Sequence, residues 1–132
     1  MNDIRQTREG IRIHEAADFA GMHAAGRIAA QILDEVAPLV QPGTTTGAID
    51  DFIRNRVVEL GTVSATIGYR GYQHASCISV NHVVCHGIPD DKPLREGDIV
   101  NIDVTYILAG WHGDSSRMYP VGPIKRAAER LL

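Results

Sequence analysis

Two aspartates within one apolar stretch are the residues whose type and spacing could do chemistry. Residues 97–120 read as a β-hairpin that turns at an Ala-Gly pair, because strand-forming runs flank that pair. With this turn, Thr105 lies opposite Asp114. Asp103 then lies opposite Ser116, which makes the two aspartates diagonal neighbours on one face, about 7–8 Å apart at the backbone. Such converging carboxylates suit one or two divalent cations; the alternative is solvated carboxylates on an exposed face, because two oxygen ligands do not complete a metal site.

The elements that must position this hairpin begin with two helices. Apolar residues that step by three or four predict a long helix over residues 13–37. The run Thr44–Thr46 offers an N-cap for a second helix, and Asp50 and Asp51 suit the positive end of its first turn. Gly61 is the expected stop of that helix.

Strands follow the helices. Short extended runs are expected over residues 62–67, 77–80 and 83–85. In the hairpin, every second residue forms a face that can be buried, namely Val100, Ile102, Val104, Tyr106 and Leu108. Two helices followed by antiparallel strands is an α+β order. After Pro123 the sequence reads as the start of a helix that ends with the chain, so the chain is cut there or the helix packs onto something else.

Composition limits the function classes. With 132 residues, 44% of them hydrophobic, and a net charge of −3, the chain fits one domain and predicts no nucleic-acid-binding surface. No apolar run reaches the length of a membrane span and no signal-peptide core is present, so we expect a cytoplasmic protein. Cys77 and Cys85 are expected to be reduced thiols. Because neighbouring strand residues point to opposite faces, Cys85 and His86 are not expected to pair as nucleophile and base.

Three ordered motifs carry a family resemblance. They are Val-Cys-His-Gly-Ile-Pro-Asp (84–90), Asp-Ile-Val-Asn-Ile-Asp-Val-Thr (98–105) and His-Gly-Asp-Ser-Ser-Arg-Met (112–118). Together they resemble type I methionine aminopeptidase, over nearly the whole chain. The related aminopeptidase P and prolidase branch does not usually carry the first motif. The resemblance implies half of a pita-bread fold, with the two helices packed on an antiparallel sheet. It also implies that 1–132 is a single domain, the N-terminal half of a catalytic domain that is apparently truncated.

The resemblance also assigns roles to residues of the motifs. Asp103 and Asp114 match the first two of the family's metal ligands, in the order Asp, Asp, His, Glu, Glu; the other three belong to a second half. The complete site holds two divalent ions, for which Co, Mn, Fe and Zn are all suitable. His86 matches the active-site histidine that contacts the scissile amide of the substrate. Asn81 and Val83 resemble a segment that holds a monovalent cation in some members.

A pocket for the methionine side chain is the other implied feature. Tyr69, Tyr72 and Cys77 match residues around it, together with the substrate-binding histidine, and aromatic edges with sulfur suit a flexible thioether. Two positions depart from the usual pattern. Thr66 stands where a cysteine often lines the pocket, and Arg70 stands where histidine is frequent, so the fine specificity is open.

The implied function is metal-dependent removal of the initiator methionine from nascent peptides, in which a metal-bound hydroxide hydrolyses the N-terminal Met–Xaa bond. The substrates are peptides with an N-terminal methionine, and neither nucleic acid nor membrane is an expected partner. Because three ligands are absent, we expect the chain to be inactive alone and to pair with the missing C-terminal half. The alternative is a half-pita-bread module that forms a homodimer through the face that the second half normally covers. A catalytically dead binding homologue is disfavoured, since Asp103, Asp114 and His86 are all retained.

Overall fold

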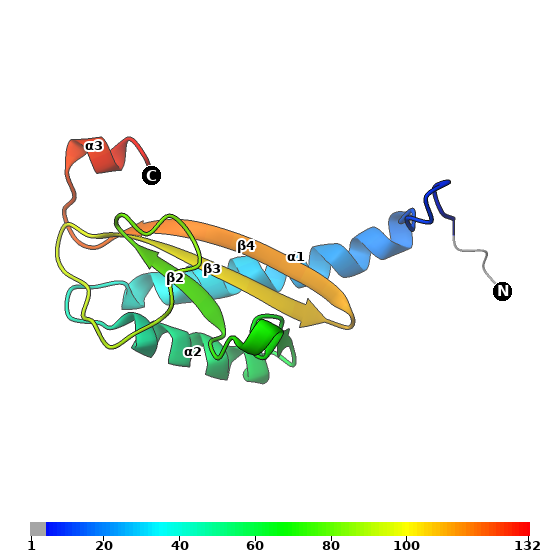
Figure 1. The fold of residues 1–132 in the computed structure, drawn as a ribbon, viewed down its shortest axis with the longest axis horizontal. Coiled ribbons are helices and arrows are strands. Elements are labelled where there is room, and N and C mark those ends of the chain that lie inside the picture. The colour runs from blue at the N-terminus through cyan, green and yellow to red at the C-terminus, as the bar shows by residue number, and fades with distance from the viewer. Residues whose placement is uncertain (1–4) are drawn as a thin grey trace.

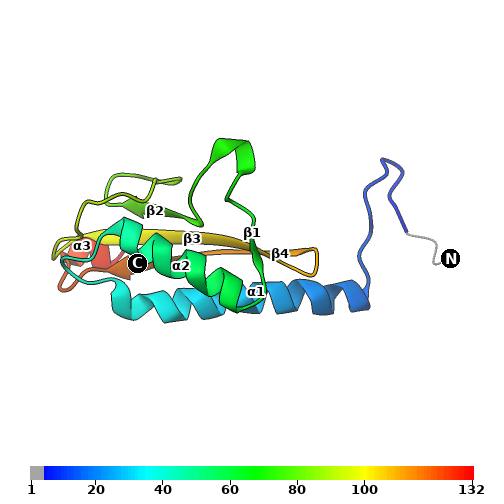
Figure 2. The same ribbon diagram turned by 90° about the horizontal axis from the view of Figure 1, so that it is seen from below.

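Two helices cover one face of a four-stranded antiparallel sheet, and loops cover part of the other face (Figures 1 and 2). This arrangement is that of a computed structural model, which describes residues 5–132. The helices are α1 (Ala16–Val36), α2 (Thr46–Glu59) and a short α3 (Arg126–Glu129). The strands are β1 (Val63–Ser64), β2 (Ser76–Val80), β3 (Ile99–Leu108) and β4 (Trp111–Pro120), and short 3₁₀ turns span Ala37–Leu39 and Tyr69–Gly71.

The central strand is β3, and its register with β4 is the one predicted from the sequence. β4 pairs along the whole of β3, while β1 and β2 share the other side of β3. The hairpin turns at Ala109 and Gly110, whose φ angles of 49° and 85° are the left-handed values that a two-residue hairpin turn requires. Thr105 pairs with Asp114. The predicted placement of Asp103 and Asp114 as diagonal neighbours on one face is therefore confirmed.

Capping residues set the limits of the helices. α1 begins after Glu15, whose backbone N–H donates to the carboxylate of Asp18 at 2.9 Å, so the helix starts later than the predicted residue 13. α2 begins after Thr45, whose Oγ1 accepts the N–H of Ala48 at 3.0 Å. Gly61, with a φ of 67°, follows the end of α2. The predicted threonine cap and glycine stop are thus confirmed.

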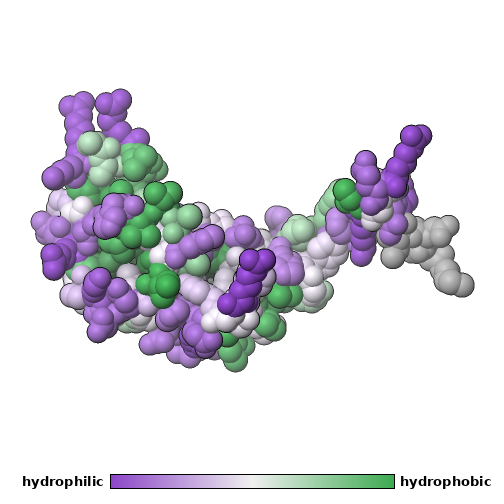
Figure 3. Space-filling model, in the orientation of Figure 1, coloured by the Kyte–Doolittle hydropathy of each residue, from purple (hydrophilic) through white to green (hydrophobic). Residues whose placement is uncertain are grey.

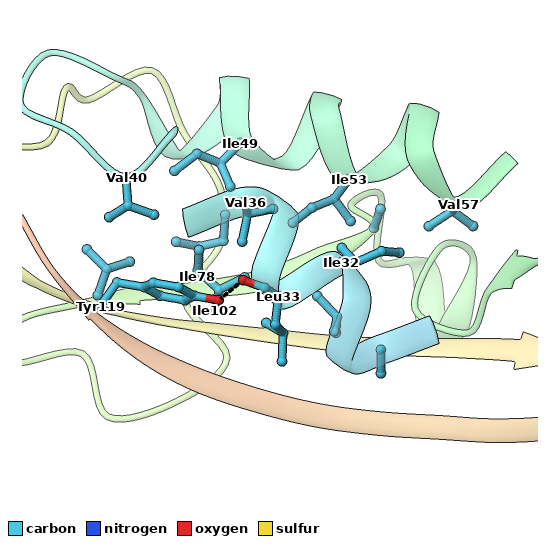
Figure 4. Close-up of a cluster of buried hydrophobic side chains, with 14 of the residues drawn as sticks. Ile32, Leu33, Val36, Val40, Ile49, Ile53, Val57, Ile78, Ile102 and Tyr119 are labelled. Atoms are coloured by element: carbon cyan, nitrogen blue, oxygen red, sulfur yellow. Dashed lines mark hydrogen bonds between the residues drawn. The ribbon is translucent and has the colours of Figure 1, made fainter. Parts of the chain in front are cut away.

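The hydrophobic core lies between the two helices and β3 (Figure 4). Four of the five predicted alternate residues of β3 are buried: Val100, Ile102, Val104 and Tyr106 are at most 1% exposed. The fifth, Leu108, is only partly buried, because it lies at the turn end of the strand. Each helix adds one aliphatic stripe, as period-three-and-four spacing requires. The main contributors are Ala29, Ile32, Leu33, Val36, Ile49, Ile53, Val57, Ile78, Val100, Ile102, Val104, Tyr106 and Tyr119.

Ion pairs join the elements at the rim of the core. Arg56 of α2 donates to both carboxylate oxygens of Glu35 on α1, at 2.7 and 3.0 Å, and this bidentate contact lowers the pKa of Glu35. Arg117 of β4 donates to Asp34 of α1 at 2.6 Å. These partly exposed pairs orient α1 against its two neighbours, and each adds little net stability.

Two buried tyrosines make a matched test of hydrogen bonding in the core. The hydroxyl of Tyr119 donates to the carbonyl of Leu33 (Figure 4), whereas the hydroxyl of Tyr106 has no partner within residues 5–132. We expect Tyr119→Phe to lower the free energy of unfolding by about 1–2 kcal/mol. Tyr106→Phe should leave it unchanged or raise it, because it removes a buried hydroxyl that bonds to nothing. Urea denaturation measures both, and equal losses in the two variants would contradict this reading.

The connection from β2 to β3 differs from the sequence prediction. The sequence predicts an extended run over residues 83–85, but these residues form no strand. They follow a turn at residues 81–82, which the Val83 N–H closes by donating to the carbonyl of Val80 at 3.1 Å, and Cys85 lies at a bend. Cys85 and His86 are therefore not neighbours in a strand. The alternation argument for their side chains does not apply, because a bend imposes no alternation.

Two other expected elements are shorter than predicted. The extended run over 62–67 narrows to β1, because Thr66 turns the chain, with its hydroxyl donating to the carbonyl of His74 at 2.7 Å. The expected C-terminal helix forms only the four residues of α3. None of the helices in residues 5–132 has the length and hydropathy needed to cross a membrane.

Candidate metal and substrate site

The carboxylates of Asp103 and Asp114 lie together on the sheet face that the helices leave open. Burial raises the pKa of Asp103, the negative charge of Asp114 and a hydrogen bond between the two raise it further, and His86 opposes these effects. Across residues 5–132, no Lys or Arg forms an ion pair with either aspartate. Two close carboxylates without a cationic partner are the donor set that a hard divalent cation neutralises.

The aspartate pair is a partial site. Among the described residues, no three His, Cys, Asp or Glu side chains gather as a metal-binding group. Asp103 and Asp114 could each supply carboxylate oxygens to a divalent ion, and further ligands must come from outside this chain or from water. The residues present therefore fit a divalent metal that the described residues would contact from one side only.

A cavity of about 730 Å³ opens beside the pair. Cys77 of β2 lies directly opposite Asp103 and lines the cavity. Thr105 lies directly opposite Asp114 and lines it too. The volume falls in the range of small-ligand pockets. The structure thus brings a binding cavity and two carboxylates to neighbouring positions on the same strands.

The residues predicted to form the methionine pocket gather at this one cavity. Burial raises the pKa of the Cys77 thiol, and the negative charges of Asp103 and Asp50 raise it further, so the thiol is neutral near pH 7. The Tyr72 hydroxyl donates to the carbonyl of Ser76 at 2.9 Å. Neutral sulfur and an aromatic ring make a wall that suits an apolar, polarisable side chain. The lining includes Thr66, Tyr69, Arg70, Tyr72, Cys77 and His86.

Arg70 stands at the cavity mouth in an unusual backbone conformation. Its φ of 49° is left-handed, which is uncommon for a residue with a side chain. Its guanidinium lies over the ring of Tyr69, 5.5 Å from the ring centre. Of the two residues that depart from the family pattern, Arg70 is thus an exposed cation beside the pocket.

The loop that carries His86 is pinned to β2 by its glycine. A Cβ on Gly87 would lie 2.1 Å from the carbonyl oxygen of Ile78, so no side chain fits there. Gly87 donates its N–H to the Ser79 hydroxyl at 3.0 Å and accepts the Ile78 N–H at 2.8 Å. This close approach holds His86 at the cavity, where its charge acts on Asp103.

Asn81 has a structural task in the β2–β3 connection. Its amide nitrogen donates to Asp98 at 2.8 Å, and its amide oxygen accepts the N–H of Ile99 at 3.1 Å. The residue itself adopts a φ of 54°. A monovalent cation at this segment stays a prediction.

One polar cluster at the cavity wall was missed by sequence reasoning. The prediction that Asp50 and Asp51 lie in the first turn of α2 is wrong, because the helix starts at Thr46 and has no acidic residue in that turn. Asp50 is instead buried and accepts two hydrogen bonds from Ser76. The partners are far apart in sequence, so no local motif announces the cluster. The only available signal was the position of Asp50 between the buried residues of an apolar stripe.

Comparison with known proteins places this geometry in a family. The model of metallopeptidase family M24 matches residues 20–132. The methionine aminopeptidase of Escherichia coli is 50% identical over 123 residues, which is 92% of this chain and 47% of the relative. The crystal structure of methionine aminopeptidase from Rickettsia prowazekii superposes with a TM-score of 0.89 at 49% identity, covering 91% of this chain and 48% of that one. The structure from Thermotoga maritima gives a TM-score of 0.86 at 35% identity.

These matches define a class of metal-dependent peptidases with an α+β, half-pita-bread arrangement. The chain belongs to metallopeptidase family M24, and its relatives in that family are methionine aminopeptidases. The chain spans about half the length of the curated relatives that it matches. A prolidase from Pyrococcus furiosus, 18% identical with a TM-score of 0.74, shares the fold. The predicted family and fold class are thereby confirmed.

Proposed function

We propose that residues 1–132 form one domain, the N-terminal half of a methionine aminopeptidase catalytic unit. The observation that carries the proposal is the pair Asp103 and Asp114 beside a cavity walled by Tyr72 and Cys77. The matching relatives from Rickettsia prowazekii and Escherichia coli are methionine aminopeptidases, which supports the same reading. The substrates are nascent peptides with an N-terminal methionine, and the reaction is hydrolysis of the bond after that methionine, in the cytoplasm, where the free thiols of this chain stay reduced.

Each residue of this half has a task in that reaction. Asp103 and Asp114 hold divalent ions, which when bound supply a Lewis acid and an activated water. Tyr69, Tyr72 and Cys77 bind the methionine side chain and thereby orient the scissile bond. His86 donates a hydrogen bond to the scissile amide and stabilises the charge that develops there. The chain alone is inactive, because it holds the metals from one side.

Ligand protection of a thiol tests the pocket directly. In the native protein, L-methioninamide should slow the alkylation of Cys77 by iodoacetamide, while L-alaninamide, which is too short to fill the cavity, should not. Cys85 is exposed and serves as the reference thiol in the same molecule, with mass spectrometry reporting both rates. Equal protection by the two amides, or none by either, would count against a methionine pocket.

Peptide hydrolysis tests the inactivity of the isolated half. With Mn²⁺ or Co²⁺ in excess, a verified monomer should release no methionine from a Met-Ala-Ser peptide. Turnover by the monomer that disappears in Asp103→Asn would contradict this, and would mean that the remaining ligands are supplied from within this chain.

A second candidate is a self-associating module, favoured by one feature of the sheet. The outer edge of β4 pairs with no strand in residues 5–132, over the ten residues from Trp111 to Pro120. An edge of this length can template pairing with a second copy about a two-fold axis. Apolar surface gathers on the face seen in Figure 3, and Val84 and Ile88 of the β2–β3 connection are 90% and 65% exposed, which adds to this. Light scattering at high protein concentration decides, since a monomeric mass excludes the homodimer.

A further inference from the structure

A buried carboxylate behind the cavity wall has no part in the proposed chemistry. Asp50 of α2 is 1% exposed. Its Oδ1 accepts the Ser76 N–H at 2.9 Å and the Ser76 hydroxyl at 2.7 Å. Its Oδ2 lies 3.2 Å from Nδ1 of His74 and 3.5 Å from the guanidinium of Arg54. A carboxylate is buried this fully only when donors surround it, and most of these donors come from the segment that leads into β2.

That segment carries, or is hydrogen-bonded to, three of the side chains that line the cavity. The Ser76 carbonyl accepts the hydroxyl of Tyr72 at 2.9 Å, and Cys77 is the next residue along β2. The Thr66 hydroxyl donates to the carbonyl of His74 at 2.7 Å. Thr66, Tyr72 and Cys77 all line the cavity. The carboxylate therefore fixes the backbone to which these side chains are attached or hydrogen-bonded.

The packing of α2 does not depend on this carboxylate. Ile49, Ile53 and Val57 lie on the same helix face and are 0–3% exposed, so they dock the helix through apolar contacts. An amide at position 50 keeps the shape of the side chain and loses its charge. The network can thus be weakened while the core stays in place.

We propose that Asp50 is a positioning residue for the methionine pocket, an inference that rests on the proposed function. Its carboxylate holds Ser76, and through Ser76 it holds the Tyr72 ring and the Cys77 thiol at the spacing that a methionine side chain fills. Loss of the carboxylate frees the start of β2 and loosens one wall of the cavity.

The test compares alkylation of Cys77 in four native proteins, the unaltered chain, Asp50→Asn, Ser76→Ala and Asp51→Asn. Asp51 is the exposed neighbour on the same helix, so its variant matches the change in charge. Rates are compared at a pH where the thiol is fully ionised, because the charge of Asp50 also raises the pKa of Cys77. Asp50→Asn should raise the Cys77 rate roughly tenfold, as expected for local opening after hydrogen bonds are lost. The alkylation rate of Cys85 should be the same in all four proteins. The Cys77 rate in Asp51→Asn should equal that of the unaltered chain.

Two further readouts separate positioning from general stability. Because Asp50 acts through Ser76, the double variant Asp50→Asn/Ser76→Ala should react no faster than the faster of the two single variants, whereas independent destabilisation would be additive. The concentration of L-methioninamide that halves the Cys77 rate should rise roughly tenfold in Asp50→Asn and stay unchanged in Asp51→Asn.

An unchanged Cys77 rate in Asp50→Asn overturns the inference. If that variant does not unfold cooperatively, Ser76→Ala decides in its place, and an unchanged Cys77 rate there has the same meaning. Absence of methioninamide protection in the unaltered chain would count against the methionine pocket. The comparison of Cys77 rates uses no methioninamide. It would therefore still decide whether Asp50 holds the start of β2 in place.

Discussion

Replacing Gly113 by alanine is expected to lower the free energy of unfolding by about 3 kcal/mol or more. Gly113 is buried in β4, where a Cβ would lie 2.2 Å from the carbonyl oxygen of Ala25 and 2.8 Å from the backbone nitrogen of Gly26. Both contacts are backbone atoms of α1, so no side chain can swing aside. The helix and the strand must separate, and that separation opens the core between α1 and the sheet.

Gly26 provides the matched control for this prediction. It lies on α1 beside the same contact, but a Cβ at that position would meet nothing within 4 Å. Gly26→Ala should therefore raise the free energy of unfolding by about 0.5–1 kcal/mol, because alanine favours the helix. Urea denaturation of the two variants measures both effects. If the two variants lose similar amounts of unfolding free energy, the close backbone contact does not distinguish Gly113 from Gly26 and the prediction is wrong.

Gly113→Ala should also weaken metal binding. Asp114 is the next residue in β4, so a strand that moves away from α1 moves this carboxylate away from Asp103. The Mn²⁺ affinity should fall in Gly113→Ala and stay unchanged in Gly26→Ala. An unaltered affinity in a destabilised Gly113→Ala protein would show that the strand shift does not reach the next residue.

The hairpin was predictable because its information is local. A glycine-containing turn sets the register of the hairpin. Strand alternation then places Asp103 and Asp114 on one face, and it places Val100, Ile102, Val104 and Tyr106 on the other. The threonine cap of α2 is local in the same way. Such features depend on residues a few positions apart, and one sequence contains them in full.

The cavity wall could not be predicted because its contacts are long-range. Asp50 reads as a helix-dipole carboxylate until Ser76, 26 residues later, is seen to donate to it. In the sequence Gly87 is one of several glycines in a loop. Only the structure shows that the carbonyl of Ile78 lies where its Cβ would be. Val83 and Val84 favour a strand, yet they follow a turn at residues 81–82 and form none, and the chain then bends at Cys85 just before His86 reaches the cavity. In each case tertiary contact overrides the local preference.

Asp103→Asn is expected to abolish metal binding and, at the same time, to stabilise the protein in the presence of a chelator. The first effect follows because one of two carboxylates is lost, and the Mn²⁺ affinity should fall by at least about 100-fold. The second follows from electrostatics. Burial and the negative charge of Asp114 raise the pKa of Asp103, so the folded state disfavours the ionised carboxylate relative to the unfolded chain.

The sign of the pH dependence follows from that shift. A carboxyl with a raised pKa binds its proton more tightly in the folded state, so its stabilising contribution is present at low pH. That contribution is lost as the pH rises from the usual aspartate range through the raised pKa of Asp103. With chelator at pH 7, Asp103→Asn should therefore have a melting temperature a few degrees above that of the unaltered chain. The two proteins should converge under acidic conditions, where both side chains at position 103 are neutral.

Metal should reverse the order of the two melting temperatures. Divalent ions bind the folded chain through both carboxylates, so Mn²⁺ should raise the melting temperature of the unaltered protein as its concentration exceeds the dissociation constant. Asp103→Asn should not respond. Asp91→Asn, which removes an exposed carboxylate from the β2–β3 connection, is the control and should follow the unaltered protein in both conditions. If Asp103→Asn is less stable than the unaltered chain in the presence of chelator, Asp103 supports the fold and the prediction is wrong. The expected reversal of the two melting temperatures on adding Mn²⁺ requires two carboxylates that repel each other at pH 7 until a metal binds them.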